Sequence, residues 1–406
     1  MGTLDQAGDV AASAGSGARQ RRTKVEIVKI GIVKEMAPGE RRVSGTPETV
    51  KKFTALGATV AVETGAGLSA AISDADYVAM GATVADRAAT VADADIILGV
   101  QGPDAASVAG ARPGAWIVAG LNPFVERARI DAYAAAGFEA LAMEFMPRIT
   151  RAQSMDILSS QSNLAGYKAV LDAAAEYGRS FPMMMTAAGT VSPAKAFIMG
   201  VGVAGLQAIA TARRLGAQVS ATDVRSATRE QIESLGAKAI FVESVAGIEG
   251  EGKGGYATEM SEEYRQAQAE LVSSHIAKQD IVITTALIPG KAAPRLVSDA
   301  QIASMKPGSV IVDLAVEQGG NVEGAVAGEV VERHGVKIVG HRNVPSRLAA
   351  DASALFARNL YNFLSAFWNK ERNAPVLDEE IGNAVRVTQG GKIVSERLLQ
   401  LAGGMQ

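Results

Sequence analysis

The sequence contains no cysteine, and this absence excludes disulfide bonds, thiolate metal sites and a cysteine nucleophile. The formal net charge is only −3, so the chain lacks the basic surplus that would neutralise a nucleic-acid backbone. It also lacks a run of about 18–20 consecutive apolar residues, the length that a membrane-spanning helix needs. We therefore expect a soluble, cytoplasmic protein that binds no nucleic acid and does not insert into a membrane.

Histidine is scarce as well, which limits the supply of general acids and bases. The chain has three: His275, His334 and His341. His275 falls in a helical stretch and His334 precedes the turn at Gly335, so we expect both at surface or structural positions. His341 follows a predicted strand and could face a cleft, but nothing in the sequence assigns it a role. No metal site is predicted.

The 406 residues suffice for two or three domains, and the 48% of hydrophobic residues can fill more than one core. Strand-length apolar runs alternate with helical stretches, a pattern typical of parallel sheets in an α/β fold. The expected strands are 25–33, 59–63, 95–100, 115–119 and 138–142, then 196–199, 218–221, 239–242, 280–284, 309–313 and 336–339. The expected helices include one opened by Thr46 and Pro47, a long connector at 159–177 and one from 349 through 363.

These elements divide into two Rossmann-like domains, each a mainly parallel sheet with helices on both faces and with an NAD cleft between them. We expect residues 25–158 and 345–406 to form the first α/β domain, and residues 159–344 the nucleotide-binding Rossmann domain. Residues 1–24, rich in glycine, alanine and serine, predict a disordered tail. An organellar presequence is the alternative, although no apolar region follows Arg21-Arg22.

A glycine pattern directly follows the strand predicted at 196–199. Gly200, Gly202 and Gly205 have the spacing Gly-x-Gly-x-x-Gly, and a helical stretch at 206–215, a second strand and Asp223 follow in that order. This sequence of elements indicates a dinucleotide-binding fold. The first glycine permits a tight turn, the second lets the backbone approach the pyrophosphate, and the third lets the helix lie close to the sheet. The alternative is a glycine-rich turn that binds nothing.

The acidic residue at the end of the second strand bears on which nucleotide binds. Asp223 can accept hydrogen bonds from both hydroxyls of the adenosine ribose, and its charge would repel a 2′-phosphate, so it favours NAD over NADP. Arg225 weakens this preference, because a nearby arginine can accommodate a phosphate.

A dense polar segment, residues 146–163, lies between the two predicted domains. Arg148, Gln153 and Asp156 could reach the nicotinamide end of a dinucleotide held on the second domain, since such ligands bind in clefts between domains. The alternative is a polar linker in which Ser159 or Ser160 caps the next helix.

This segment resembles the signature of proton-translocating nicotinamide nucleotide transhydrogenases, and specifically of their NAD(H)-binding peripheral alpha subunit. The resemblance covers roughly residues 28–365, and the same motifs are shared more loosely with alanine dehydrogenases. The similar segments are 146–156, 158–160, 163–167, 186–191, the turn at 200–205, 222–225, 254–257, 284–291 and 308–315.

The resemblance implies a Re/Si-specific transfer of hydride from NADH, bound by this chain, to NADP⁺ bound on a partner. It implies two partners, a membrane-spanning subunit that moves protons and an NADP(H)-binding beta subunit, and it implies a homodimer. Because the chain ends before any membrane segment, we expect the subunits to be separate. The chain would then be cytoplasmic and peripheral to the inner membrane through these partners.

The resemblance also assigns residues position by position. Around the nicotinamide and its ribose it places Arg148, Ile149, Thr150, Gln153, Asp156 and Ser159, of which Arg148, Gln153, Asp156 and Ser159 are the candidate catalytic residues. At the pyrophosphate it places Gly200, Gly202, Val203, Ala204 and Gly205, and at the adenosine end Asp223, Val224 and Arg225. Gly255, Tyr256, Gln268 and Leu287 would complete the pocket.

Tyr256 belongs to a glycine-rich region, 247–255 and the residues after it, which matches the family's mobile loop that closes over the nucleotide. Composition alone favours an exposed loop aromatic at this position.

Three functions remain to be separated. An alanine dehydrogenase must bind a keto acid and move a proton. Arg42 matches that family's carboxylate-binding arginine, but Gln101 stands where its lysine is expected and residues 119–123 contain no histidine. Hydride transfer between two nicotinamides needs no proton donor or acceptor, only positioning and the exclusion of water. A non-catalytic NAD-binding regulator is the third possibility, and the polarity of residues 148–156 argues against it.

Overall fold

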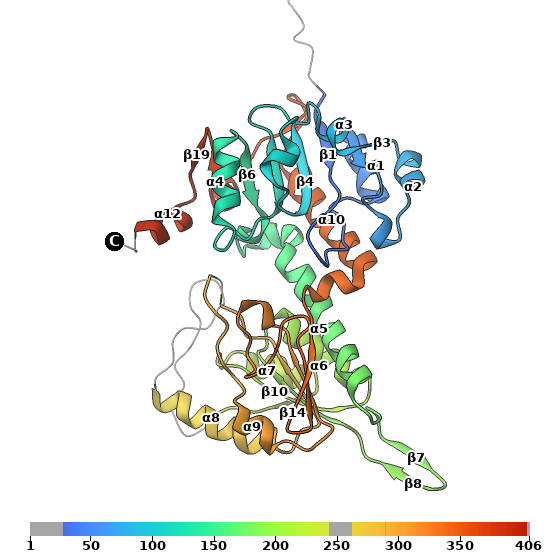
Figure 1. Ribbon diagram of the computed structural model, residues 1–406, viewed down its shortest axis with the longest axis vertical. Coiled ribbons are helices and arrows are strands. Elements are labelled where there is room, and N and C mark those ends of the chain that lie inside the picture. The colour runs from blue at the N-terminus through green and yellow to red at the C-terminus, as the bar shows by residue number, and fades with distance from the viewer. Residues whose placement is uncertain (1–26, 243–261, 289, 404–406) are drawn as a thin grey trace, which may run out of the picture.

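The computed structural model describes residues 27–242, 262–288 and 290–403, which form two α/β units joined by the long helix α5, Ile157–Glu176 (Figure 1). Each unit is built on one large, mainly parallel sheet with helices on both faces, so the predicted fold class is confirmed. The tail expected at 1–24 and the glycine-rich segment 247–255, with Gly255 and Tyr256, lie outside the described residues.

The first sheet has the order β3-β2-β1-β4-β5-β6, and all of its strands are parallel. Its strands are β1 Lys29–Ile32, β2 Thr59–Glu63, β3 Thr83–Ala85, β4 Ile96–Gln101, β5 Trp116–Gly120 and β6 Glu139–Ala142. The connecting helices are α1 Pro47–Ala55, α2 Asp74–Ala79, α3 Arg87–Val91 and α4 Arg127–Ala135. Thr46 caps α1 reciprocally with Thr49, and Pro47 stands in its first turn, as predicted.

The second sheet has the order β11-β10-β9-β12-β13-β15-β14, and only β14 runs antiparallel to its neighbour. Its strands are β9 Lys195–Met199, β10 Gln218–Thr222, β11 Lys238–Ala239, β12 Ile281–Thr284, β13 Val310–Asp313, β14 Val330–Arg333 and β15 Val336–Val339. Its helices are α6 Val203–Arg214, α7 Thr228–Ser234, α8 Glu262–Ile276 and α9 Asp299–Ser304.

The alternation of side chains along these strands separates two cores in the second unit. On β9, Ala196 and Ile198 face α5, α6 and α7, whereas Phe197 and Met199 face α8 and α9. Every residue of β12 and β13 is buried, which is the pattern of a parallel strand covered on both faces. The glycine turn after β9 therefore lies at the carboxyl ends of the strands, on a sheet that is packed on both faces.

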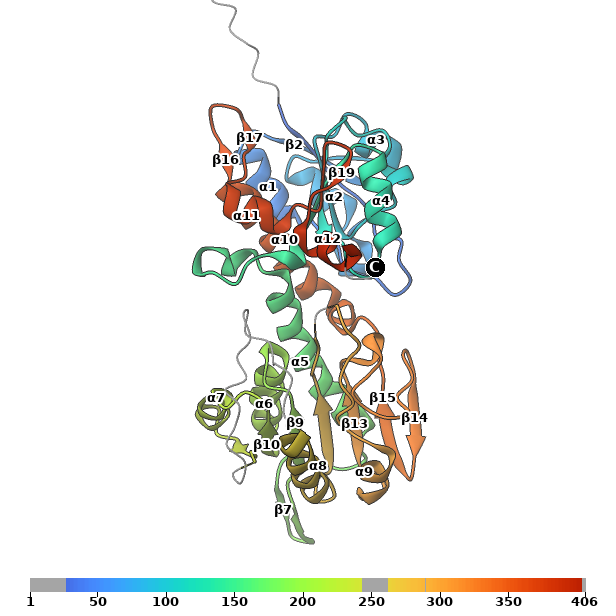
Figure 2. The same cartoon turned by 90° about the vertical axis from the view of Figure 1, so that its left-hand side faces the viewer.

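After the second sheet the chain returns to the first. Helix α10, Ala349–Ala366, places Phe356, Leu360 and Phe363 in one core with Ile30 and Leu98 of the first sheet (Figure 2). The remaining elements are two small antiparallel ladders and two helices on the first unit. They are β16 Trp368–Asn369 with β17 Ala374–Pro375, α11 Glu379–Val385, β18 Thr388–Gln389 with β19 Lys392–Ile393, and α12 Glu396–Gly403.

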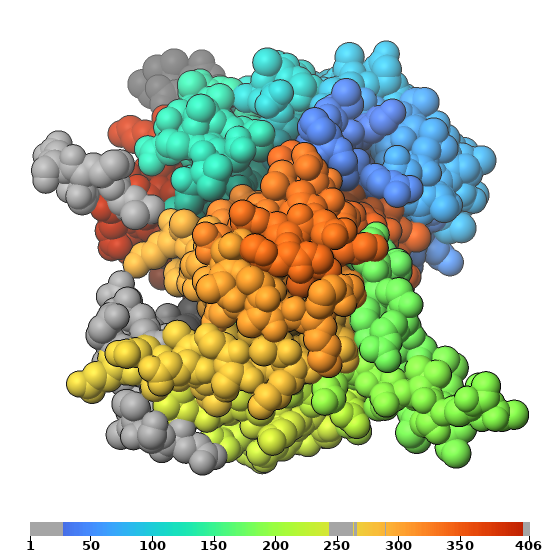
Figure 3. Space-filling view, turned by 60° about the horizontal axis from the view of Figure 1, so that its bottom comes forward, coloured from blue at the N-terminus to red at the C-terminus, as the bar shows by residue number. Residues whose placement is uncertain are grey.

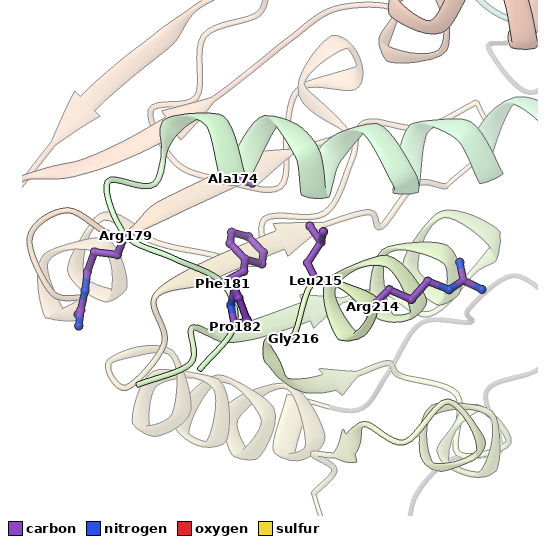
Figure 4. Close-up of a pocket in the computed structure, with 7 residues that line it drawn as sticks. All are labelled: Ala174, Arg179, Phe181, Pro182, Arg214, Leu215 and Gly216. Atoms are coloured by element: carbon purple, nitrogen blue, oxygen red, sulfur yellow. The ribbon is translucent and has the colours of Figure 1, made fainter. Parts of the chain in front are cut away.

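Several features of the fold were not predicted. A hairpin of β7, Met184–Thr186, and β8, Gly189–Val191, projects from the second unit (Figures 1 and 3). The edge strand β14 was also missed, and the strand expected at 239–242 is reduced to the two residues of β11. A surface pocket of about 520 Å³ opens near the base of the hairpin, lined by Ala174, Arg179, Phe181, Pro182, Arg214, Leu215 and Gly216 (Figure 4).

Candidate nucleotide-binding site

The turn after β9 places its three glycines in three different surroundings. Gly200 has a positive φ of 98°, and a Cβ there would lie 2.6 Å from Thr285 Oγ1. A Cβ on Gly205 would lie 1.9 Å from the carbonyl oxygen of Gly200, so α6 approaches the turn as closely as only glycine allows. A Cβ on Gly202 would meet nothing within 4 Å. The backbone at Gly202 is therefore open to a ligand, while the other two glycines hold the turn against the helix.

Helix α6 starts at this opening without a side-chain cap. Its N-cap residue is Gly202, and Val203, Ala204 and Gly205 form its first turn. The N–H groups of a first helical turn have no partner within the helix, and together with the helix dipole they attract anions. Helix α5 crosses here, because a Cβ on Gly166 would lie 2.0 Å from the carbonyl oxygen of Ala204. The first turn of α6 is thus packed against α5 on one side, and the backbone at Gly202 stays open to a ligand.

Asp223 follows β10 and lies beside the same turn. Its Oδ2 accepts a hydrogen bond from the Val201 backbone N–H at 2.7 Å, which ties the carboxylate to the glycine turn. The side chain of Arg225 pairs with both carboxylate oxygens, at 2.9 and 3.0 Å. Val224, which lies between Asp223 and Arg225 in the sequence, is half-buried.

The charge state of Asp223 follows from these contacts. Burial by itself raises the pKa of the carboxyl group, but hydrogen bonds from the Arg225 side chain and from the backbone of Arg225 and Val201 outweigh it and lower the pKa below its usual value. Asp223 is therefore an anion at neutral pH.

The polar segment forms a short 3₁₀ helix, η4 Thr150–Met155, followed by α5. Arg148, Thr150 and Gln153 are exposed and Ile149 is half-buried. Asp156, and not Ser159 or Ser160, caps α5, so the cap named in the alternative interpretation as a polar linker was wrong. The Asp156 carboxylate accepts both the backbone N–H and the hydroxyl of Ser159, at 3.0 and 2.6 Å, because a carboxylate can accept from the backbone and the hydroxyl together.

Helix α10 holds this segment from behind. Asn359 and Asn362 both donate to the carbonyl oxygen of Ser154, at 2.8 and 3.1 Å, and Ser160 Oγ donates to Asn359 Oδ1 at 2.7 Å. Arg151 pairs with Asp378 and Glu380 of the C-terminal region. Sequence reasoning missed these supports, because asparagines some 200 positions away carry no local signal of the contact.

The remaining predicted residues lie at different distances from the turn. Leu287 is partly exposed on the loop after β12, and this loop touches the turn where Thr285 Oγ1 donates to the Gly200 carbonyl oxygen at 3.0 Å. Asn321 fixes the same loop by exchanging hydrogen bonds with the backbone of Ala286. Gln268 is half-buried on α8, which packs on the face of the sheet opposite to α6. The structure thus places Leu287 on a loop that touches the turn and Gln268 on a helix that covers the other face of the sheet.

A second polar cluster lies at the carboxyl ends of β1 and β4 in the first unit. Arg42 pairs with Glu40 through two nitrogens, at 2.8 and 2.6 Å, and also donates to Gln161 on α5 and to Asn343. Gln101 donates to Glu40 as well, at 2.9 Å. Burial opposes ionisation of Glu40, but the hydrogen bonds and charge of Arg42 dominate and lower its pKa to about 2. Arg42 is therefore ion-paired within the first unit, and its hydrogen bonds to Gln161 and Asn343 join that unit to the second.

Glu35 stands beside this cluster and accepts hydrogen bonds from the backbone N–H groups of Val100 and Gln101. Burial is the main cause that raises its pKa to about 7, and the charge of Glu40 adds to it. A carboxyl group with a raised pKa in the folded state binds its proton more tightly there than in the unfolded chain.

We expect this group to make stability depend on pH. The stabilising contribution of protonated Glu35 to the free energy of unfolding is fully present below pH 4.5 and is lost as the pH rises from 4.5 through about 7. The free energy of unfolding of Glu35→Gln, measured by urea denaturation from pH 5 to 8, should lack this decline when compared with the unchanged chain. Parallel pH profiles for the two proteins would contradict the assignment.

The three histidines stand apart from the polar segment. His275 contacts Ser220 at 2.8 Å and lies edge-on to Phe197 in the core, and burial lowers its pKa. His334 pairs with Asp299 on the surface. His341 is half-buried, and burial together with the charge of Arg347 lowers its pKa. His275 and His334 thus occupy the structural and surface positions expected of them.

The described residues also bear on metals and membranes. Among them no group of three or more histidine, aspartate or glutamate side chains could hold a metal ion. In the same stretch of the chain, no helix combines the length and apolar character that crossing a membrane requires. The surface pocket of Figure 4 lies at the C-terminal end of α6, roughly 18 Å along the helix from the glycine turn, so it is separate from the candidate site.

Comparison with known proteins agrees with this architecture. Residues 31–165 match the model of the alanine dehydrogenase/PNT N-terminal domain, and residues 169–396 match that of the C-terminal domain. The chain is 55% identical over 379 residues to the first part of NAD(P) transhydrogenase subunit alpha of Rhodospirillum rubrum, covering 91% of this chain and 99% of that protein. It is 46% identical over 374 residues to the protein of the same name from Rickettsia prowazekii, covering 91% and 96%.

A crystal structure of transhydrogenase from Sinorhizobium meliloti superposes with a TM-score of 0.81 at 55% identity, covering 90% of this chain and all of that one. The family models account for both units and the relatives for nine-tenths of the chain. The chain therefore belongs to the alanine dehydrogenase/PNT family.

Proposed function

We propose that this chain is the NAD(H)-binding alpha subunit of a proton-translocating, Re/Si-specific transhydrogenase. The observation that carries the proposal is the open backbone at Gly202, in front of an uncapped helix and beside the anionic Asp223. A pyrophosphate needs such an approach to backbone N–H groups, and a ribose needs such a carboxylate. The relatives named NAD(P) transhydrogenase subunit alpha support the choice of reaction.

The proposed site extends from the turn toward the polar segment. Gly200, Gly202, Val203, Ala204 and Gly205 would hold the pyrophosphate, and Asp223, Val224 and Arg225 would lie at the adenosine end. Arg148, Ile149, Thr150, Gln153, Asp156 and Ser159 would surround the nicotinamide, with Leu287, Gln268, Gly255 and Tyr256 completing the pocket. We also propose that residues 25–158 and 345–406 form one domain and residues 159–344 the other, a division supported by the packing of α10 on the first sheet.

When bound, NADH supplies a hydride from C4 of its nicotinamide to C4 of the nicotinamide of NADP⁺ on the partner subunit. No proton leaves or enters at these carbons, so the chain needs no general acid or base there. Its own residues orient the ring and exclude water. The Asp156–Ser159 cap and the support from Asn359 fix the backbone from which Gln153 projects, and this rigidity is what such positioning needs.

The second candidate is an alanine dehydrogenase-like oxidoreductase, which the position of Arg42 favours. In this structure the guanidinium donors of Arg42 go to Glu40, Gln161 and Asn343, and Gln101 donates to Glu40. Both side chains are therefore engaged with Glu40. The guanidinium donors of Arg42 are committed to residues of the chain, and the amide of Gln101 has no acidic proton to give to a keto acid.

We propose that the partners are a membrane-spanning subunit and an NADP(H)-binding beta subunit, which keep the chain in the cytoplasm at the inner membrane. The relatives are named as one portion of a subunit alpha, and this name supports further subunits. We also propose a homodimer. Met183, Met184 and Met185 are exposed at the projecting hairpin, Met185 by 79%, and such a cluster of apolar side chains is typical of a contact surface.

An isotope experiment tests the proposed reaction. The chain is mixed with the NADP(H)-binding partner, NADH deuterated at C4, and NADP⁺. We expect NADPH carrying the deuterium at C4 on one face only, and no NADPH without the partner. Deuterium lost to water would contradict direct transfer, and activity with pyruvate and ammonium in the absence of a partner would replace the proposal with the dehydrogenase. Proton movement is measured in vesicles that contain the membrane subunit.

A further inference from the structure

The carboxylate of Asp223 has no acceptor position left for a ligand in this structure. A carboxylate offers about four lone-pair positions. Oδ1 accepts from the backbone N–H and from Nε of Arg225, both at 2.9 Å. Oδ2 accepts from the Val201 N–H at 2.7 Å and from Nη2 of Arg225 at 3.0 Å. A ribose whose two hydroxyls bind this carboxylate must therefore displace two of the four donors.

Two of these donors are fixed and two can leave. The Val201 N–H belongs to the glycine turn, which is held by the bond from the Gly200 N–H to the Thr222 carbonyl oxygen and by the close contact of Gly205. The Arg225 N–H belongs to the turn that leads into α7, where Thr228 caps the Arg225 carbonyl group. The guanidinium, which also donates to the Val201 carbonyl oxygen at 3.2 Å, moves by side-chain rotation alone. It is the donor group that a ribose can replace without displacing a backbone N–H group from Asp223.

We propose that Arg225 is a latch on the adenosine-ribose site, a residue that occupies Asp223 in the free chain and leaves it when the ribose binds. The proposal rests on the proposed binding of NAD(H) at this turn. In the free chain the latch neutralises a carboxylate that is only 8% exposed, and an unpaired charge there would be costly. In the bound state the two ribose hydroxyls take over the same oxygens.

The latch has a consequence for affinity. A ligand that binds only the open form sees its affinity reduced by the fraction of chains that are open. Arg225 therefore weakens the binding of every ligand that carries the adenosine ribose. A ligand without that ribose does not need the latch to open, so its affinity is independent of the latch.

The test compares Arg225→Met with the unchanged chain by calorimetric titration of ADP-ribose and of reduced nicotinamide mononucleotide. Methionine keeps an unbranched side chain and removes its donors. We expect ADP-ribose to bind roughly five- to thirtyfold more tightly and the mononucleotide to bind as before. Both ligands carry phosphate, so equal changes for the two would report only the lost charge and would overturn the latch. Unchanged or weaker binding of ADP-ribose would overturn it as well.

Two controls separate the proposed latch from the proposed binding of NAD(H) at this turn. Asp223→Ala must weaken ADP-ribose binding. If it does not, the ribose is not at Asp223 and the proposed site itself fails, whereas a sensitive Asp223→Ala with an insensitive Arg225→Met overturns the latch alone. In the unsubstituted protein, the ¹⁵N-labelled Nε–H group of Arg225, identified by its loss in Arg225→Lys, should lose its protection from exchange when ADP-ribose is added. Retained protection would overturn the latch without reliance on the stability of a variant.

Discussion

Replacing Gly205 with alanine is expected to weaken NADH binding by roughly a hundredfold or more and to lower the free energy of unfolding by about 2–4 kcal/mol. The added Cβ would lie 1.9 Å from the carbonyl oxygen of Gly200, and that oxygen is backbone in a tight turn, so it cannot rotate away. Helix α6 must then withdraw from the sheet, and its first N–H groups move away from the position where a pyrophosphate would sit. Urea denaturation and NADH titration by fluorescence measure the two effects.

Gly202 supplies the matched control within the same turn. Its φ is −80°, and a Cβ there meets nothing within 4 Å. The free energy of unfolding of Gly202→Ala should therefore lie within about 0.5 kcal/mol of that of the unchanged chain. If the pyrophosphate approaches this backbone, the added methyl group should still weaken the binding of NADH by about tenfold. Full NADH affinity in Gly205→Ala would show that the position of α6 does not govern binding. Full affinity in Gly202→Ala would place the pyrophosphate elsewhere.

Removing the charge of Arg42 is expected to cost about 3–5 kcal/mol of stability at neutral pH, because it leaves the carboxylate of Glu40 buried without its partner. The Glu40 side chain is fully buried, and its pKa of about 2 depends on Arg42. A lowered pKa stabilises the folded chain above the ordinary value of 4.5, and this contribution disappears as the pH falls from 4.5 through about 2. Arg42→Met should lack it at every pH. Urea denaturation at pH 7, where the contribution is fully present, and at about pH 2.5, where most of it is lost, measures the difference.

The double variant Glu40→Gln with Arg42→Met is the control for this second prediction. It removes both charges, so we expect it to be more stable than Arg42→Met alone. The pair also joins the first unit to Gln161 on α5, and for that reason both variants should increase proteolysis between the units. A double variant that is no more stable than Arg42→Met would show that packing, and not the buried charge, is what the single variant loses.

Local sequence predicted the centre of each unit well. The strands β9 and β10 and the helix α6 lie close to their expected positions, because a buried parallel strand reads as a short apolar run and glycines mark its end. Helix α6 begins at Val203, slightly earlier than the helical stretch expected from Leu206, since the glycine turn itself provides the helix start. The cap of α1 by Thr46 was signalled by the Thr-Pro pair.

The regions that local sequence missed depend on distant contacts or on exposed apolar residues. Met184 and Met185 have the apolar character of core residues, yet they stand on the projecting hairpin. The choice of Asp156 over Ser159 as the cap of α5 depends on one carboxylate that binds two groups of Ser159 at once. Asn359 supports Ser154 across 205 positions of chain.

The candidate site shows the same division. The sequence indicated Asp223 and Arg225 as neighbours of an adenosine, with no sign that the two would pair with each other. That pairing arises because β10 ends where Arg225 can reach back over the carboxylate. A spacing pattern records which residues are present at a turn and does not record which hydrogen bonds they have already made.

The core of the first sheet has a consequence for the order in which the two units fold during synthesis on the ribosome. Phe356, Leu360 and Phe363 complete this core from the far side of the second unit, and Arg41 donates to Ser346 across 305 positions. At synthesis rates of about 5–20 residues per second that interval takes roughly 15–60 s. The last strand of the second unit, β15, ends at Val339 and is synthesised before α10, so the second unit can fold while the first unit still exposes an apolar sheet face. Pulse-labelled nascent chains should therefore acquire protease resistance in reverse of their order of synthesis, the later unit before the earlier one.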